Sequence, residues 1–225
     1  MRGRAEMARR GRQLLGFQPV IMEPDRVKAV RRTLETVVEA EVNLLPRDPA
    51  LKEGIRTPHN FLNHMLETLA WRACMNIAVS FEDVPGYRSG HVVCEDIGMT
   101  LGEILKCLWE ANQDRGINGA GYGVMGIDEA LARCVVSFEN RAKLFFTPPP
   151  GAVMERVADM LATDLAQFLD GLAQGGRLTL HADVLKGGDP HHMWESVFRA
   201  LGEAVRCAFA ANQWRGGATP GLKGF

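Results

Sequence analysis

Two long segments of the chain carry apolar residues at helical spacing. In each segment the apolar positions fall at i, i+4, i+7, i+8 and i+11, so they line one face of an α-helix. These positions are Ile97, Leu101, Ile104, Leu105 and Leu108 in the first segment, and Val197, Leu201, Ala204, Val205 and Ala208 in the second. We therefore predict two long amphipathic helices, each with one face directed toward a core.

A shorter helical stretch precedes each long helix, and strand-like runs fill much of the remaining chain. The short helices are expected over residues 61–70 and 164–173. Runs rich in β-branched and aromatic residues predict strands. These runs cover residues 36–42, 75–81, 132–138, 143–147 and 178–184. Each half of the chain is thus predicted to form strands, a helix, strands and a long helix.

The two halves also match residue by residue. Residues 91–116 align with residues 191–216 without a gap, at an offset of 100. The identities are His91 with His191, Glu95 with Glu195, Leu101-Gly102-Glu103 with Leu201-Gly202-Glu203, Cys107 with Cys207, Ala111-Asn112-Gln113 with Ala211-Asn212-Gln213, and Arg115 with Arg215. Chance does not place so many identities in one register, so we infer a gene duplication. The predicted fold class is α+β, with two duplicated half-domains, each a mixed β-sheet with helices packed on one face, forming one compact unit.

A basic segment precedes this predicted domain. Residues 1–12 hold five arginines and one glutamate. Such a segment could touch RNA or a membrane surface or act in targeting, but a solvated, disordered tail is the simpler interpretation. Pro148-Pro149-Pro150-Gly151 is expected to form a loop within the second half. The expected boundaries are 1–26 for the tail, 27–225 for the domain, about 27–117 and 118–216 for the half-repeats, and 217–225 for a C-terminal tail.

The composition is that of a soluble globular protein. The 225 residues are 46% hydrophobic and 24% charged, with a formal net charge of -1, which provides enough apolar material for a core. No apolar run reaches the roughly 18 residues of a membrane span, and the near-neutral charge gives no broad attraction to nucleic acid. The five cysteines include no CxxC pair and are odd in number. We therefore expect no disulfide framework and a location in the reducing cytoplasm.

The duplicated helices carry a candidate metal-binding pattern. His91 stands four residues before Glu95, and His191 stands four residues before Glu195. Residues i and i+4 share one helix face, so each pair can hold one ion through an imidazole and a carboxylate. A nitrogen and oxygen ligand set suits manganese, iron or zinc. His192 points about 100° away from its neighbour, so one histidine of the pair is expected to reach a neighbouring site.

Other catalytic templates are absent. The sequence contains no HExxH, Walker A or GxSxG motif, and no GxGxxG that links a predicted strand to a predicted helix. This argues against the corresponding metalloprotease, nucleotide-binding and hydrolase sites. The glycines between Gly116 and Gly126 could hold a phosphate or form a flexible turn, and we favour the turn.

Over roughly residues 27 to 225 the chain resembles the imidazoleglycerol-phosphate dehydratase family. The family's motifs occur here in order and at the family's spacing. They are Arg32-Thr33-Leu34-Glu35-Thr36 for R-x-T-x-E-T, Phe61-Leu62-Asn63-His64-Met65-Leu66 for F-L-D-H-M-L, His91-Val92-Val93-Cys94-Glu95 and His191-His192-Met193-Trp194-Glu195 for H-H-x-x-x-E, Gly126-Ile127-Asp128-Glu129-Ala130-Leu131 for M-D-E-A-L, Thr179-Leu180-His181 for T-L-H, and Gly221-Leu222-Lys223-Gly224 for S-T-K-G.

The resemblance implies a metal-dependent hydro-lyase of histidine biosynthesis. In the family, imidazoleglycerol phosphate loses water to give imidazoleacetol phosphate, two Mn²⁺ per chain lie between subunits, and trimers assemble into a homo-oligomer of twenty-four chains. The proton to be removed is on an unactivated carbon, so the neighbouring imidazole must accept negative charge. Metal ions on the ring nitrogens stabilise that charge.

The resemblance also assigns roles to residues of this chain. Glu35 is a candidate general acid or base, Asp128 orients the substrate, and Glu195 belongs to the catalytic centre. Arg141 and Lys223 match positions that bind the substrate phosphate. The metal ligands that remain by type are His64, His91, Glu95, His191, His192 and Glu195.

Four positions depart from the family pattern. Val92 and Gln167 stand where the family has metal-binding histidines, Gly119 replaces a phosphate-binding arginine, and Gly221-Leu222 replaces the terminal serine. One of the two metal sites has therefore lost its crossing ligand, which leaves one or two Mn²⁺ per chain. The sequence does not assign His64 to either site.

Three functions remain open at this point. The chain is an active dehydratase, a lyase with another substrate, or a non-catalytic scaffold that kept the fold and the assembly. His59 and His181 are expected to be structural or exposed histidines rather than ligands.

Overall fold

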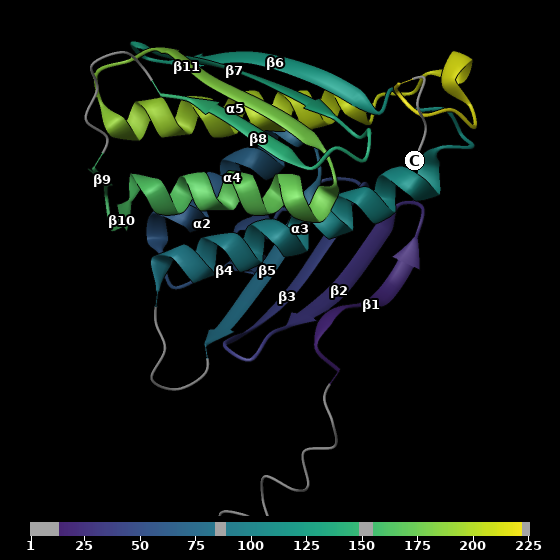
Figure 1. The fold of residues 1–225 in the computed structure, drawn as a ribbon, viewed down its shortest axis with the longest axis horizontal. Coiled ribbons are helices and arrows are strands. Elements are labelled where there is room, and N and C mark those ends of the chain that lie inside the picture. Colours follow the sequence, from purple (N-terminus) through teal and green to yellow (C-terminus); the bar gives the residue numbers. More distant parts are fainter. Residues whose placement is uncertain (1–13, 84–88, 149–154, 222–225) are drawn as a thin grey trace, which may run out of the picture.

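The computed structural model describes residues 14–83, 89–148 and 155–221. Figure 1 shows two sheets with helices between them. The strands are β1 (Gly16–Glu23), β2 (Arg26–Arg32), β3 (Thr36–Asn43), β4 (Ile55–Arg56), β5 (Asn76–Asp83), β6 (Ala120–Ile127), β7 (Ala130–Ser137), β8 (Lys143–Thr147), β9 (Arg156–Val157), β10 (Met160–Leu161) and β11 (Thr179–Lys186). The helices are η1 (Leu51–Gly54), α2 (Asn60–Ala73), α3 (Gly90–Asn112), α4 (Ala162–Gly176), α5 (Pro190–Ala208) and η2 (Gln213–Arg215).

The two halves repeat one sheet topology, which confirms the predicted fold class and duplication. The first sheet has the order β1-β2-β3-β5-β4 and the second β6-β7-β11-β8. In both sheets a hairpin, β2–β3 or β6–β7, pairs antiparallel with the strand that follows the shorter helix, which is β5 or β11. A strand at the edge of the sheet, β4 or β8, then pairs parallel with β5 or β11. Within the described residues, strand β1 has no counterpart in the second sheet.

The four long helices form the centre of the molecule. Helix α3 packs on the first sheet and α5 on the second, while α3 contacts α4 and α2 contacts α5 across the junction of the halves. The inner faces of strands and helices supply one continuous core in which alternate strand residues are buried, as in the sequence Ala130, Ala132, Cys134 and Val136 of β7. The five cysteines are free.

Helices α3 and α4 approach backbone to backbone. Each presents two glycines four residues apart, Gly98 and Gly102 on α3 and Gly171 and Gly175 on α4. A methyl group at any of these positions would overlap backbone atoms of the facing helix, such as the carbonyl oxygen of Met99 opposite Gly175. The absence of side chains here allows the close contact between the halves.

The structure corrects two expectations. Residues 16–23, assigned to the tail, form strand β1, because the apolar Phe17, Ile21 and Met22 pair antiparallel with β2. The segment favoured as a flexible turn contains strand β6, whose Gly121 and Gly123 lie against the backbone of α5. Residues 1–13 and 149–151 lie outside the described ranges. None of the helices within those ranges combines the length and apolarity that a bilayer-crossing segment needs.

Candidate metal centre

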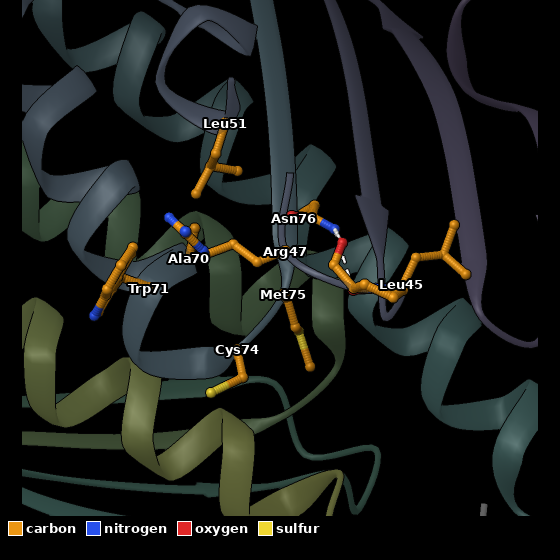
Figure 2. A pocket seen from close by; sticks show the side chains of 9 residues that line it. Leu45, Arg47, Leu51, Ala70, Trp71, Cys74, Met75 and Asn76 are labelled. Atoms are coloured by element: carbon orange, nitrogen blue, oxygen red, sulfur yellow. Dashed lines mark hydrogen bonds between the residues drawn. The ribbon is translucent and has the colours of Figure 1, made fainter. Parts of the chain in front are cut away.

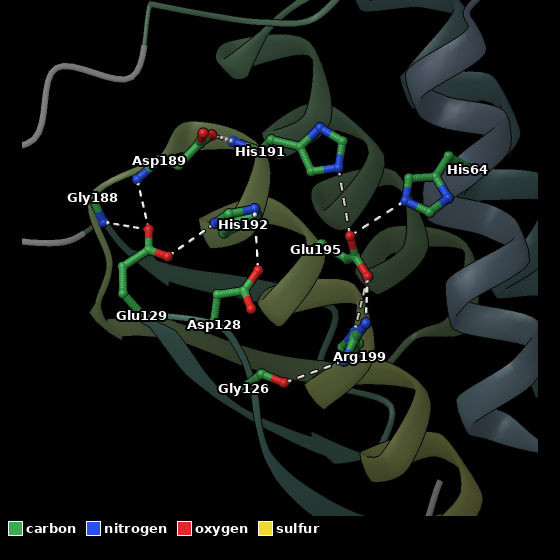
Figure 3. Close-up of polar contacts among 10 residues, drawn as sticks. All are labelled: His64, Gly126, Asp128, Glu129, Gly188, Asp189, His191, His192, Glu195 and Arg199. Carbon is green, nitrogen blue, oxygen red and sulfur yellow. Dashed lines mark hydrogen bonds and ion pairs between the residues drawn. The ribbon is translucent and has the colours of Figure 1, made fainter.

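His64, His191 and Glu195 converge where α2 meets the first turns of α5 (Figure 3). The Oε2 atom of Glu195 lies 3.3 Å from Nε2 of His64 and 3.5 Å from Nε2 of His191. Among the residues that the structure describes, this is the one group of three such side chains whose ligand atoms all lie within 4.8 Å of one another. His64 therefore belongs with the second-half pair, a question that the sequence left open.

Local sequence fixes the two helix starts that carry this cluster. Pro190 occupies the first turn of α5, and the Asp189 carboxylate accepts a hydrogen bond from the backbone N–H of His191 at 2.7 Å. At α2, the Asp159 carboxylate accepts from the backbone N–H groups of Asn60 and Phe61. These caps satisfy N–H groups that a helix start leaves free. The imidazoles are thus carried on stable first turns.

Glu195 is the buried member of the cluster. Its side chain is 8% exposed, whereas the side chains of His64 and His191 are each 44% exposed. Burial raises the pKa of Glu195, but hydrogen bonds and charge from Arg199, with a contribution from His64, outweigh burial and lower its pKa overall. The carboxylate is therefore ionised at neutral pH and able to bind a cation.

The cluster fits a divalent transition metal. Two ligand atoms that each bind one ion at about 2.1 Å lie roughly 3.0 to 3.5 Å apart, which matches the two distances from Oε2 to the imidazole nitrogens. Two imidazoles and one carboxylate suit manganese, iron or zinc. A hollow of about 350 Å³ opens beside His64, so the cluster has access to solvent.

His192 faces away from this cluster, toward the turn between β6 and β7. Its Nδ1 lies 2.9 Å from Oε2 of Glu129 and its Nε2 lies 3.4 Å from Oδ2 of Asp128. Glu129 also accepts from the backbone N–H groups of Asp189 and Gly188. These N–H groups, first that of Asp189, and the His192 hydrogen bond lower the pKa of Glu129 to about 2, and Glu129 raises the pKa of His192.

The first half presents a weaker version of the site. Nε2 of His91 lies 3.4 Å from Oε2 of Glu95, and both side chains are about half exposed. Val92, which stands where the second half has His192, lines a hollow of about 250 Å³. Within the described residues no third ligand joins this pair. Gln167, half-buried on α4, stands at the position of the second half that corresponds to His64 on α2.

The remaining predicted site residues are not brought to the cluster by any described contact. Glu35 is exposed in the turn between β2 and β3, where its backbone N–H donates to Thr33. Among the contacts of the described residues, Arg141 contributes a backbone carbonyl, which accepts a hydrogen bond from the Thr179 hydroxyl. Lys223 lies outside the described residues.

His59 and His181 have other surroundings. His59 is the residue before α2, with its ring 4.0 Å from Asp159. His181 is exposed on β11 and stacks on Phe145, with ring centroids 4.5 Å apart. Neither belongs to the cluster.

Two residues of the site were not singled out by sequence. Arg199 stands four residues after Glu195, the spacing of a helical ion pair, and Glu129 adjoins Asp128. Residue pairs at both spacings are common on protein surfaces, so the sequence alone does not mark them as part of a site. Their role follows from the fold, which brings α5 and the β6–β7 turn together.

A second hollow, lined by residues from the C-terminal end of α2 and from the loop after β3, contains no residue of the cluster (Figure 2). Its volume is about 540 Å³, and the Arg47 guanidinium lies 5.0 Å from the centre of the Trp71 ring. The other residues that line it are mostly apolar, and His64, His191 and Glu195 are not among them.

Comparison with known proteins gives a consistent result. A model of the imidazoleglycerol-phosphate dehydratase family matches residues 57–205. The imidazoleglycerol-phosphate dehydratase of Methylococcus capsulatus is 35% identical over 195 residues, which are 86% of this chain and 94% of the relative. That of Caldivirga maquilingensis is 36% identical over 195 residues, covering 86% and 95%.

Solved structures show the same fold. The crystal structure of imidazoleglycerol-phosphate dehydratase from Staphylococcus aureus matches with a TM-score of 0.67 and 25% identity, covering 83% of this chain and 99% of that one. The enzyme from Pyrococcus furiosus matches with a TM-score of 0.66 and 28% identity, covering 81% and 94%. The similarity thus extends over both half-repeats, and the chain belongs to the imidazoleglycerol-phosphate dehydratase family.

Proposed function

We propose that this protein is a metal-dependent dehydratase that converts imidazoleglycerol phosphate to imidazoleacetol phosphate in histidine biosynthesis. The observation that carries the proposal is the convergence of His64, His191 and Glu195 on one point, in a chain of this family. The two imidazoles and the carboxylate would hold one Mn²⁺. When bound, such an ion supplies Lewis acidity that stabilises negative charge on the substrate imidazole.

The chain's own residues would handle the substrate and its proton. Glu35 is proposed to take the proton from the substrate carbon or to return one to the leaving hydroxyl, as an exposed carboxylate on a short turn. Asp128, on the equivalent turn of the second half, is proposed to orient the substrate. Arg141 and Lys223 would hold the phosphate by charge.

A second ion is proposed at His91 and Glu95, completed by His192 of another copy of the chain. The support is that His192 makes its contacts at the exposed start of α5 and contacts neither residue of its own first-half pair within the described chain. A homo-oligomer, trimer-based as in the family, would bring these residues together.

The proposal is tested by metal content and turnover. Protein purified without chelator and supplied with Mn²⁺ is examined by elemental analysis, and the dehydration of imidazoleglycerol phosphate is assayed directly. Two ions per chain with turnover support the full proposal. His64→Ala and Glu195→Gln are expected to lose one ion and nearly all activity, while His181→Ala, an exposed histidine outside the cluster, is the matched control.

One observation favours a second candidate. The half-exposed His91 and Glu95 pair has no third ligand among the described residues, and Val92 and Gln167 fill the corresponding places. A protein with one ion per chain and no turnover of the phosphate substrate would be a lyase with another substrate. A protein that binds no ion and still assembles would be a scaffold.

A further inference from the structure

Arg199 holds one oxygen of Glu195 and leaves the other to the histidines. Its Nη2 and Nε atoms donate to Oε1 of Glu195 at 2.6 and 3.0 Å. The facing oxygen, Oε2, is the one that lies 3.3 Å from His64 and 3.5 Å from His191. Figure 3 shows the carboxylate between the guanidinium on one side and the two imidazoles on the other.

Arg199 has a third contact that fixes its plane. Its Nη1 donates to the carbonyl oxygen of Gly126 at 3.3 Å, at the end of β6 and just before the turn that carries Asp128. The guanidinium therefore bridges α5 and β6. Its side chain is 24% exposed, and it is held by hydrogen bonds to both elements.

We propose that Arg199 is a positioning residue that fixes Glu195 as a ligand through one oxygen. The inference rests on the proposed metal centre and assigns a residue outside its ligand set. A carboxylate can rotate about its last bond and offer an ion one oxygen or both. With Oε1 held by two charge-assisted hydrogen bonds, Oε2 alone faces the site.

The planar guanidinium is suited to this task. Its Nε and Nη2 reach one oxygen of Glu195 on α5 while Nη1 reaches the Gly126 carbonyl on β6. A lysine ammonium cannot reproduce these three contacts in one geometry. Arg199→Lys keeps the charge and loses the geometry. Arg199→Gln loses the charge and most of the contacts.

If Arg199 acted only through its positive charge, its removal would change the metal affinity in the opposite direction. A positive charge one carboxylate away from a bound cation repels that cation, so its removal would strengthen metal binding. A positioning role predicts weaker binding, because ordering a free carboxylate then costs part of the binding free energy. When affinity is measured at two pH values, so that proton competition at Glu195 is seen separately, the sign of the change in affinity separates the two roles.

The experiment measures Mn²⁺ affinity by calorimetry in the full-length wild type, Arg199→Gln, Arg199→Lys and Arg206→Gln proteins. We expect about 10- to 100-fold weaker binding for Arg199→Gln, a smaller loss for Arg199→Lys, and no change for Arg206→Gln. Arg206 is the matched control because it forms a similar ion pair with Glu203 on the same helix. Thermal unfolding checks that each variant is folded.

A second readout is the visible absorption spectrum of Co²⁺-loaded protein, which reports ligand geometry. We expect Arg199→Lys to alter this spectrum and Arg206→Gln to leave it as in the wild type. Unchanged or tighter Mn²⁺ binding in Arg199→Gln would overturn the inference while leaving the metal centre intact. A wild-type protein that binds no ion would overturn the metal centre and the inference together.

Discussion

The side chain of Glu129 illustrates how a single residue organises the start of α5. Its carboxylate accepts hydrogen bonds from the backbone N–H groups of Gly188 and Asp189 and contacts His192. It therefore holds the two residues just before the helix and the ring of a proposed ligand at the same time. Since a protonated imidazole cannot bind a metal ion, the pKa of His192 that this contact raises would make binding at the proposed ligand compete with protons.

We predict that Glu129→Gln lowers the pKa of His192, because the hydrogen bond and charge that raise it are removed. The neutral imidazole reacts with diethyl pyrocarbonate, so the rate of modification of His192, read by peptide mass spectrometry, gives its titration curve. The curve is expected to shift to lower pH in the variant. His181 in the same digest is the internal control, and an unshifted His192 curve would contradict the prediction.

Glu103 belongs to a half-buried charge group between β2 and α3. Arg31 lies 3.7 Å from Glu103 and 3.5 Å from Asp96, and Asp96 also accepts a hydrogen bond from Thr36. Burial raises the pKa of Glu103, against the smaller lowering effect of Arg31. Its charged form is therefore less favourable in the folded chain than in the unfolded chain.

Because the pKa of Glu103 is raised in the folded state, its contribution to stability is fully present at pH values below its unfolded-state pKa. That contribution is lost as the pH rises through its folded-state pKa. We predict that Glu103→Gln unfolds at a higher temperature relative to the wild type at pH 8 than at pH 5. The expected effect is less than about 1 kcal/mol. Glu110→Gln on the same helix, where Glu110 pairs with Lys106, should show no such difference. Equal shifts at both pH values would count against the prediction.

At the scale of elements, the contact of α3 with α4 depends on its four glycines. Alanine is favoured over glycine inside a helix by about 1 kcal/mol, so helix propensity alone predicts that Gly175→Ala is stabilising. The added methyl group would overlap the carbonyl oxygen of Met99, a backbone atom that cannot move without shifting α3. Overlap should win.

We therefore predict that Gly175→Ala lowers the free energy of unfolding by about 1 to 3 kcal/mol, measured by urea denaturation. The control is Gly216→Ala, where the nearest atoms lie at 3.5 Å in ordinary contact and the change should stay within about 0.5 kcal/mol. Equal stability of the two variants would show that α3 and α4 separate more easily than the glycine contacts imply.

Helices and strands with a regular pattern of apolar, β-branched or aromatic residues were predictable from sequence, and strands without such a pattern were not. Helices α3 and α5 follow from their apolar spacing, and β3, β5, β7, β8 and β11 from β-branched and aromatic runs. Strand β6 lacks that signal because Gly121 and Gly123, which face α5, replace the apolar residues of an ordinary inner face. Two-residue spacing of glycines is more typical of a turn.

The sequence pointed to the three residues of the candidate cluster, but it did not predict that they lie together. The duplication identified both His and Glu pairs, but the place of His64 depends on α2 packing against α5, a contact between halves that no local pattern encodes. Arg199 was missed for the same reason. Its partner Gly126 contributes only a backbone oxygen from β6.

At the scale of the whole molecule, the two proposed metal sites differ in whether one chain supplies all their ligands. One cluster is assembled from α2 and α5 of a single chain, whereas the pair on α3 lacks a third ligand within the described chain. Shared ligation would make that second site a property of the assembly. A mixture of two defective chains can then restore a site that neither chain forms alone.

We predict such restoration between His91→Ala and His192→Ala chains. Each variant alone should lose one Mn²⁺ per chain and its activity, since each removes a ligand of the shared site. In equal mixtures that are unfolded and reassembled together, about one quarter of the shared sites would regain both histidines if chains mix at random. Activity and Mn²⁺ content of the mixture measure this, and a mixture no better than its components would place His192 outside that site.

Strand β1 has a consequence for how copies of the molecule meet in solution. A free sheet edge offers a row of unpaired N–H and C=O groups to which another strand can add. In the first sheet β1 covers the edge of β2, and β1 itself carries Pro19, which has no N–H, next to a break in register before Ile21. Such an edge is a poor template for a further strand. The segment that resembles a disordered tail in sequence therefore protects the first half from strand-to-strand aggregation.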